Sequence, residues 1–266
     1  MHELIDPRSD SVRVFLRRWY GATTAGRPAI ALESDQIPRE LVDWHDAVAS
    51  TGVAVTFHNR PVELSKLVRS DNGMMIFWME NQGSYYWAVD PDDEQPAVFV
   101  TVYPTEEPWQ ATGETLRGFL LHCTIDEAML GAAARFVVMI PGRVAQSYLS
   151  NWFVPLGFPH LANQDPSTQL LCSHDALAQV CPPPVGYSIP GDATQMLSVA
   201  VTNPDDLDKY QADLRDYLST VPRQPPVEID ELPRSEIRSS LAAWWFGFAD
   251  LESGDRHGGG AGGLGE

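Results

Sequence analysis

Short apolar blocks separated by polar turns run from residue 74 to residue 104, and they predict a three-stranded antiparallel meander. Each block has four to seven residues, is rich in aromatic and β-branched side chains, and is bounded by Asn, Gly, Asp or Pro. The preceding Asp71-Asn72-Gly73 is a strong turn signal. No nucleophile stands beside a base in this segment, so the pattern favours a binding surface over a catalytic site.

Helical periodicity flanks the meander on both sides. Helices are predicted over residues 11–20, from residue 37 to Gly52, and over residues 115–136. Between the second and third of these, residues 53–57 predict a strand and residues 61–68 a short helical segment. The positions expected to face the core are Val12, Phe15, Leu16, Trp19, Leu41, Trp44, His45, Val48, Leu116, Phe119, Leu120, Cys123, Met129, Leu130 and Phe136.

The second half of the chain mixes prolines with further strand and helix signals. Residues 169–172 and 176–180 predict a hairpin, and residues 195–201 predict another strand. Asn203-Pro204 supplies an N-cap and a proline at the first helical position, followed by acidic residues that favour the positive end of a helix dipole. This predicts a helix with Leu207, Tyr210, Leu214, Tyr217 and Leu218 on one side.

The C-terminal part differs in composition from the rest. Residues 221–251 predict a proline-rich acidic linker followed by a Trp-rich helix, and the Gly-rich residues 252–266 are typical of a disordered tail. Trp244 and Trp245 would be costly to leave in water. We therefore expect this helix either to dock on the main body or to bind a partner.

Charge narrows the class of partner. The 266 residues include 36 acids and 18 bases, a formal net charge of −18, which disfavours nucleic acid and anionic membrane as direct partners and favours a basic protein. The N-terminus lacks the pattern of a signal peptide, and no apolar run approaches the ~18 residues of a membrane span. We predict a cytoplasmic protein; three cysteines are too few for a disulfide framework.

Several patterns resemble metal or cofactor motifs but lack the context that those motifs need. Residues 260–265 satisfy Gly-x-Gly-x-x-Gly, yet no helix follows them. Cys172, His174 and Cys181 do not have the spacing of paired zinc ligands. Residues 90–94 lack the glycine and the distal glutamate of a calcium loop. We therefore expect no cofactor, no metal and no enzymatic activity.

An enzyme remains the competing class. Its site would have to be assembled from distant residues such as His45, His58, Asp90 or Cys123. A deep pocket that holds two or more polar groups with strongly shifted pKa values would favour this alternative.

Acidic residues accumulate on and around the meander. Residues 70–116 contain no Lys or Arg and nine acids, which indicates either a solvated face or a docking surface for a basic protein. Aromatic side chains on the same strands are expected to be mostly core, with any outward-facing one serving as an interface anchor. The candidate partner-binding residues are Glu80, Tyr85, Trp87, Asp90, Asp92, Asp93, Glu94, Glu106 and Glu107.

Four segments together resemble the SUKH superfamily, which includes yeast cell-wall-assembly regulators and bacterial immunity proteins. They are residues 37–45 (Ile-Pro-Arg-Glu-Leu-Val-Asp-Trp-His), residues 80–87 after the Asn72-Gly73 turn, the Asp-rich turn that ends in Pro96-Ala97-Val98, and the helix at 116–131. The resemblance covers about residues 30–135 well and 136–220 weakly. It implies an α+β fold and a non-enzymatic module that neutralises a toxin, often a nuclease or deaminase.

The sequence as a whole predicts an α+β protein with a mixed, mainly antiparallel sheet packed against helices. The expected organisation is an N-terminal helical extension over residues 1–29, a SUKH-like domain over 30–220, and the C-terminal segments 221–251 and 252–266. The leading functional prediction is an immunity-type protein that binds a basic toxin domain in the cytosol. The alternative is an intracellular regulatory or scaffold protein that uses the same fold, with Trp244 and Trp245 as its contact point.

Overall fold

The first of two antiparallel sheets contains the predicted meander. In the computed structural model, which describes residues 1–21, 37–102, 108–183 and 194–220, this sheet has the order β1-β2-β3-β4-β5. Its strands are β1 (Arg60–Pro61), β2 (Met75–Met79), β3 (Tyr86–Val89), β4 (Ala97–Thr101) and β5 (Gln110–Thr115). The three predicted strands are confirmed, with a strand added at each edge.

Two helices cover one face of this sheet. Helix α3 (Arg39–Thr51) ends at Gly52, as predicted. Gly52 adopts the left-handed conformation, at φ 69°, that glycine accommodates at the end of a helix. Helix α4 (Leu116–Leu130) begins at Thr115, whose hydroxyl accepts the Gly118 N–H. The aromatic rings of Trp44, Phe77, Trp78, Trp87 and Phe119 pack together at the centre of this core.

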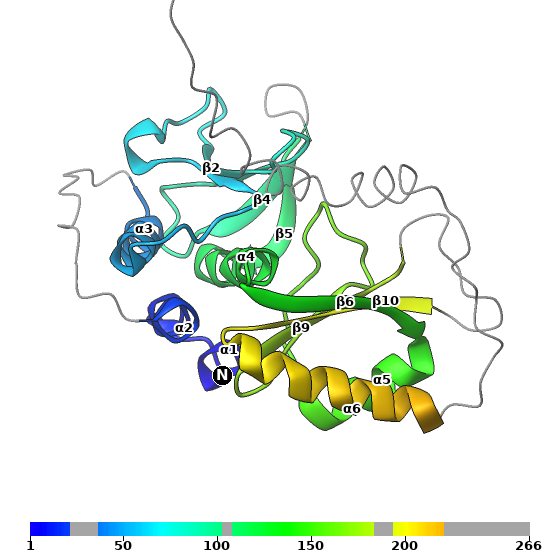
Figure 1. Ribbon diagram of the computed structural model, residues 1–266. Helices are drawn as coiled ribbons and strands as arrows, with labels where there is room; N and C mark the ends of the chain where they lie inside the picture. Colours follow the sequence, from blue (N-terminus) through cyan, green and yellow to red (C-terminus); the bar gives the residue numbers. More distant parts are fainter. Residues whose placement is uncertain (22–36, 103–107, 184–193, 221–266) are drawn as a thin grey trace, which may run out of the picture. The chain divides into compact units, whose positions relative to one another are not determined.

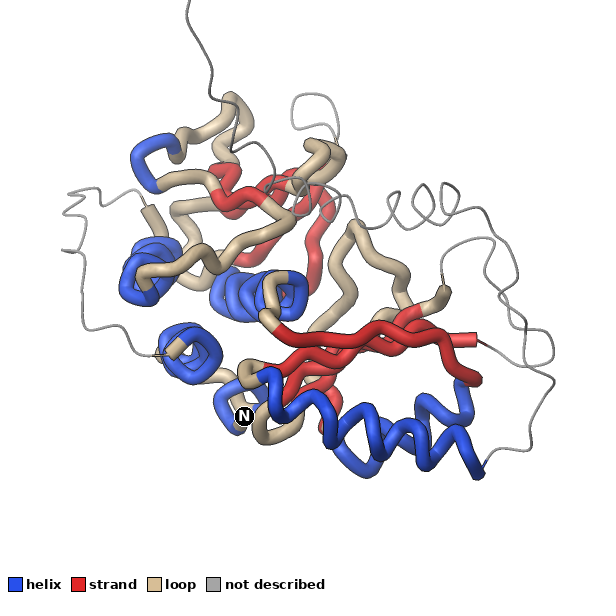
Figure 2. The backbone as a smooth tube through the Cα atoms, viewed as in Figure 1, coloured by secondary structure: helices blue, strands red, loops and turns tan. Residues whose placement is uncertain are grey.

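The second sheet has the order β6-β10-β9-β8-β7 and is also antiparallel. Its strands are β6 (Ala134–Pro141), β7 (Val154–Pro155), β8 (Gln169–Cys172), β9 (Ala176–Cys181) and β10 (Thr194–Val201). Helices α5 (Gly142–Trp152) and α6 (Leu207–Thr220) lie against one face of it (Figure 1, Figure 2). Tyr148, Leu197, Val199 and Tyr210 are buried between the helices and the strands.

Helix α4 is shared by the cores of both sheets. Phe119 and Leu120 belong to the core of the first sheet, whereas Leu121 and Ile125 pack on strands of the second. The short helix α1 (His2–Ile5) and helix α2 (Ser11–Tyr20) complete this second contact (Figure 1). A helix buried on all sides carries no single apolar face.

These elements confirm the α+β class and most of the predicted segments. The hairpin at residues 169–180, strand β10 and helix α6 occur where the sequence predicts them. Asn203 caps a 3₁₀ helix, Pro204–Asp206, that leads into α6, and its side chain accepts the Asp205 N–H. Tyr210 and Leu214 are buried in the core, as predicted.

Three predictions are wrong. Residues 53–57 form no strand, and the backbone N–H groups of Phe57 and of the following His58 donate to the side chain of Glu127 on α4 rather than to a neighbouring strand. The helix predicted to reach Phe136 ends at Leu130, and β6 begins at Ala134 because alternate residues of this run face the core. Within residues 61–68, Pro61 belongs to β1 and the helical part is limited to the 3₁₀ helix Leu64–Lys66.

Two further predictions concern the C-terminal segments and the absence of a membrane span. The linker, the Trp-rich segment with Trp244 and Trp245, and the Gly-rich tail lie outside the described residues. Among the helices that the structure describes, none has both the length and the apolar character needed to cross a bilayer.

Candidate functional site

The turn between β3 and β4 presents the exposed part of the predicted acidic surface. Asp90, Asp93 and Glu94 are exposed, and side-chain hydrogen bonds shape the turn. Asp90 Oδ1 accepts the Asp92 N–H at 3.0 Å, and Asp93 Oδ1 accepts the Gln95 N–H at 3.0 Å. The carboxylates are therefore held on a short, internally bonded turn between two strands of a packed sheet.

Asp92 differs from its neighbours because it has a cationic partner. The guanidinium of Arg69 donates to both of its carboxylate oxygens, at 2.7 and 2.5 Å. This bidentate hydrogen bonding lowers the pKa of Asp92 and raises that of Arg69. Arg69 lies one position before the base-free window of residues 70–116, so the four carboxylates at positions 90–94 keep three formal negative charges rather than four.

The other described candidates serve the fold of the first sheet. Glu80 is only 8% exposed and accepts the N–H groups of Gln82 (2.9 Å) and Ser84 (3.2 Å) in the turn between β2 and β3. Trp87 is 1% exposed inside the aromatic core, and Tyr85 is half-buried against that core. The structure thus places residues 90–94 together on the surface, whereas Glu80, Tyr85 and Trp87 are buried or half-buried in the fold. Glu106 and Glu107 lie outside the described residues.

A row of buried polar side chains on α4 was missed by the sequence analysis. His122 Nδ1 lies 3.2 Å from Glu114 Oε1, and its ring stacks on Phe158. One turn further along the helix, Asp126 accepts hydrogen bonds from the side chains of Gln164 (2.9 Å) and Gln179 (3.4 Å). Burial raises the pKa of Asp126, and His122 and the two amides oppose that rise.

Glu127 is the most completely buried carboxyl of this row. It is 0% exposed, and Oε2 accepts the backbone N–H groups of Phe57 (2.5 Å) and His58 (2.7 Å), while Oε1 accepts that of Asn59 (2.7 Å). Burial raises its pKa to about 7 against the opposite effect of these three donors. Glu127 therefore fastens the loop before β1 to α4.

The residues considered for an enzyme are distributed between surface and core. Asp90 is exposed on its turn, whereas Cys123 is 2% exposed and burial raises the pKa of its thiol well above the ordinary value. Burial lowers the pKa of His45, and His58 Nδ1 lies 3.2 Å from Asn81 Nδ2. A buried thiol with a raised pKa is a poor nucleophile.

The three candidate zinc ligands all lie on the hairpin of β8 and β9, but at opposite ends of it. Cys172 pairs with Leu177, near the turn, whereas Cys181 is the last residue of β9 and lies at the other end. Across the described ranges, no three His, Cys, Asp or Glu side chains converge as metal ligands would.

Two surface hollows lie away from the buried carboxyls. One, of about 300 Å³, is lined by charged residues of α2, α3 and α4, including Arg39 paired with Asp43 and Arg117 paired with Glu40. The other, of about 550 Å³, is mainly apolar and lies beside Met1, Trp152 and Cys172. Neither is lined by Asp126 or Glu127, so these two carboxyls meet no substrate-sized space there.

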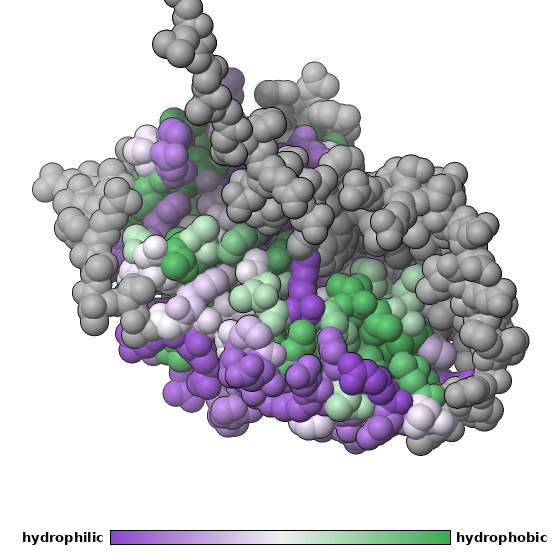
Figure 3. All heavy atoms as spheres, in the orientation of Figure 1, coloured by the Kyte–Doolittle hydropathy of each residue, from purple (hydrophilic) through white to green (hydrophobic). Residues whose placement is uncertain are grey.

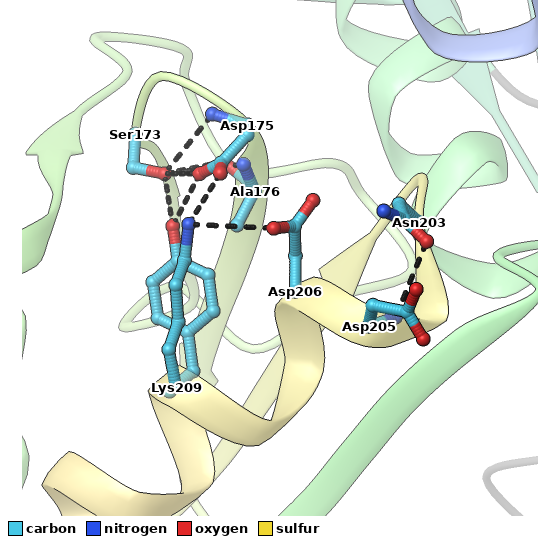
Figure 4. A network of polar contacts seen from close by, with 8 residues as sticks. Ser173, Asp175, Ala176, Asn203, Asp205, Asp206 and Lys209 are labelled. Carbon is cyan, nitrogen blue, oxygen red and sulfur yellow. Dashed lines mark hydrogen bonds and ion pairs between the residues drawn. The ribbon is translucent and has the colours of Figure 1, made fainter.

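A second polar network fastens α6 to the hairpin of β8 and β9 (Figure 4). Lys209 forms an ion pair with Asp175, and the Tyr210 hydroxyl donates to Asp175 Oδ1 at 2.6 Å. Partial burial by itself would raise the pKa of Asp175, but Lys209, Tyr210 and Ser173 together hold it below its ordinary value. The Asp175 carboxylate is therefore bound within the fold, whereas the carboxylates of Asp90, Asp93 and Glu94 are exposed.

No family model, curated protein or solved structure matches this chain. The similarity to the SUKH superfamily thus stays a prediction from the sequence, and the geometry described above is what bears on function.

Proposed function

We propose that this chain is a non-enzymatic protein-binding module that holds a basic partner against the turn between β3 and β4. The observation that carries the proposal is the exposure of Asp90, Asp93 and Glu94 on one turn whose backbone is fixed by its own side-chain hydrogen bonds. We call these three residues the acidic turn.

The placement of the acidic turn suits charge-steered association. Exposed carboxylates raise the encounter rate with a cationic surface, and the effect falls as salt screens them. The turn is short and connects two strands packed on an aromatic core, so little conformational entropy is lost when a partner binds. The net charge of −18 acts in the same direction at long range.

The partner that we propose is a basic toxin domain neutralised in the cytosol. This part of the proposal rests on the resemblance to the SUKH superfamily together with the charge. A toxin that acts on nucleic acid needs a cationic surface to bind phosphates, and an acidic module is complementary to such a surface.

Affinity capture with charge-reversed full-length protein tests this function. We expect Asp93→Lys/Glu94→Lys to lose the basic partner that the wild-type protein recovers from its native cytosol, because the acidic turn becomes cationic. The matched control is Asp208→Lys/Asp216→Lys, which makes the same change in charge at exposed positions of α6.

The control variant should still recover the partner. Equal loss with both variants would show that only the overall charge matters, and equal recovery with both would contradict a role for the acidic turn. Thermal unfolding of each variant excludes loss of fold as the cause.

A further inference from the structure

In the part of the chain that the structure describes, three of the four sheet edges are protected in ways that natural proteins use against strand addition. Strand β1 has two residues, and β7 also has two, one of them Pro155. Strand β5 pairs with β4 through a break in register, and it contains Gly113 at φ 84°. Very short strands, prolines and irregular pairing each prevent another strand from joining an edge.

Strand β6 is the fourth edge, and it has none of these protections. It is eight residues long and pairs with β10 without interruption, from Ala134 opposite Val201 to Pro141 opposite Thr194. Its only proline is the last residue. Within the described part of the chain, no strand pairs with its other side.

Apart from Arg135, the side chains of β6 are apolar, so this edge is apolar as well as regular. Phe136, Val138 and Ile140 face the core formed with α5 and α6. Val137 and Met139 point to the opposite side and are 44% and 38% exposed. Figure 3 shows hydrophobic surface gathered where β6 runs in Figure 1, bordered by the hydrophilic surface of α6. A long apolar edge of this kind favours contact with another strand.

Charge distinguishes the segment of the sequence that carries β6 from the rest of the chain. Residues 128–164, which include β6, α5 and β7, contain no Asp or Glu in a chain with 36 acids. Two copies of a protein with a net charge of −18 repel each other over most orientations. Contact through β6 brings no carboxylate of this segment against its counterpart.

We propose that β6 is the interface of a homodimer, in which the β6 strands of two copies pair antiparallel across a two-fold axis. An isologous contact of this kind needs only one self-complementary surface. Pairing centred on Val138 places Val137 of each copy opposite Met139 of the other, which gives four apolar side chains in one cluster. The second sheet of one copy then continues into the second sheet of the other. The acidic turns, which belong to the first sheet of each copy, take no part in the strand pairing.

Sedimentation analysis of the full chain over a range of concentrations tests the proposal. The wild-type mass should rise with concentration from 29.4 kDa to twice that value. The variant Val137→Lys/Met139→Lys should remain at 29.4 kDa, because pairing would bring four lysines together on one face of the joined edge, and charged side chains on an edge strand oppose strand pairing. The control is Val154→Lys on the other edge strand, β7, where the valine is 48% exposed and dimerisation should persist.

Hydrogen exchange of the wild-type protein provides a measurement that needs no variant. The β6 amides that point away from β10 should exchange more slowly as concentration rises, whereas those bonded to β10 are protected at every concentration. A monomer at every concentration, or a double-lysine variant that dimerises like the wild type, would overturn the proposal. A wild-type monomer in which the β6 amides that point away from β10 are protected at all concentrations would also overturn it, because another segment of the same chain would then occupy the edge.

Discussion

Removal of the Glu127 carboxylate should weaken the fold without touching the acidic turn. In Glu127→Ala the N–H groups of Phe57, His58 and Asn59 lose their acceptor. A buried donor without a partner costs about 1–3 kcal/mol. Asn59 is 5% exposed, so its N–H has little access to water, whereas the 49% exposed Phe57 lies where water can replace part of the lost bond.

These contributions give a destabilisation of about 3–4 kcal/mol for Glu127→Ala. Glu127→Gln keeps the methylene groups and one oxygen but turns an amide NH₂ toward a backbone donor, so we expect about 2 kcal/mol. Either loss is a large part of the roughly 5–15 kcal/mol that stabilises a typical domain.

Urea unfolding followed by tryptophan fluorescence measures this effect, since the chain has eight tryptophans. The control is Glu63→Gln, which removes a carboxylate from an exposed ion pair with Lys66 and should shift the midpoint little. A Glu127→Gln midpoint as close to the wild type as that of the control would refute the anchoring role of Glu127.

Three further effects follow from buried groups. Because the folded pKa of Glu127 is about 7 against 4.5 for a free carboxyl, the folded state binds its proton more tightly, and this stabilisation is lost as pH rises through 7. Between about pH 5 and about pH 8 the unfolding free energy of the wild type should therefore fall by about 2.5 kcal/mol more than that of Glu127→Gln, as measured by urea titrations. A rise in the unfolding free energy of the wild type relative to Glu127→Gln over this range would contradict the raised pKa. Tyr210→Phe should cost about 1–2 kcal/mol in the same assay by removing the hydrogen bond to Asp175, and an unchanged midpoint would argue against that bond. A chromogenic disulfide reagent should leave the thiols unmodified until the protein unfolds, and rapid reaction of the native protein would contradict the burial of Cys123, Cys172 and Cys181.

Local signals predicted the parts of the fold that depend on neighbouring residues. The turn chemistry at residues 173–175 and the Asn203-Pro204 cap act within a few residues, and both elements occur where these signals place them. The loop at residues 53–57 depends instead on Glu127, about 70 positions away in the chain. A strand-like composition cannot reveal that its backbone donors are satisfied by a distant side chain.

The same distinction explains the missed start of β6. Helix α4 is buried on all sides, so its apolar residues continue into those of β6 without a change of amphipathic face. Gly131 caps the end of α4, and the pairing with β10 makes the residues from Ala134 onward a strand.

The sequence predicted that acidic residues gather around the meander, but not which of them are exposed or which have a partner. The count of acids in residues 70–116 is visible in the sequence, yet the partner of Asp92 lies just outside that window, at Arg69. Glu80 and Trp87 lie on the expected turn and strand, but the fold uses both of them internally. Among the candidate partner-binding residues that the structure describes, the exposed ones are therefore those at positions 90–94.

The association rate constant with the captured basic partner tests the proposed function most directly. It should be measured at low and high ionic strength for the wild type, Asp93→Lys/Glu94→Lys and the α6 control. We expect the acidic-turn variant to associate about tenfold more slowly at low salt and to lose most of its salt dependence. A variant with the wild-type rate constant and the wild-type salt dependence would contradict binding through the acidic turn.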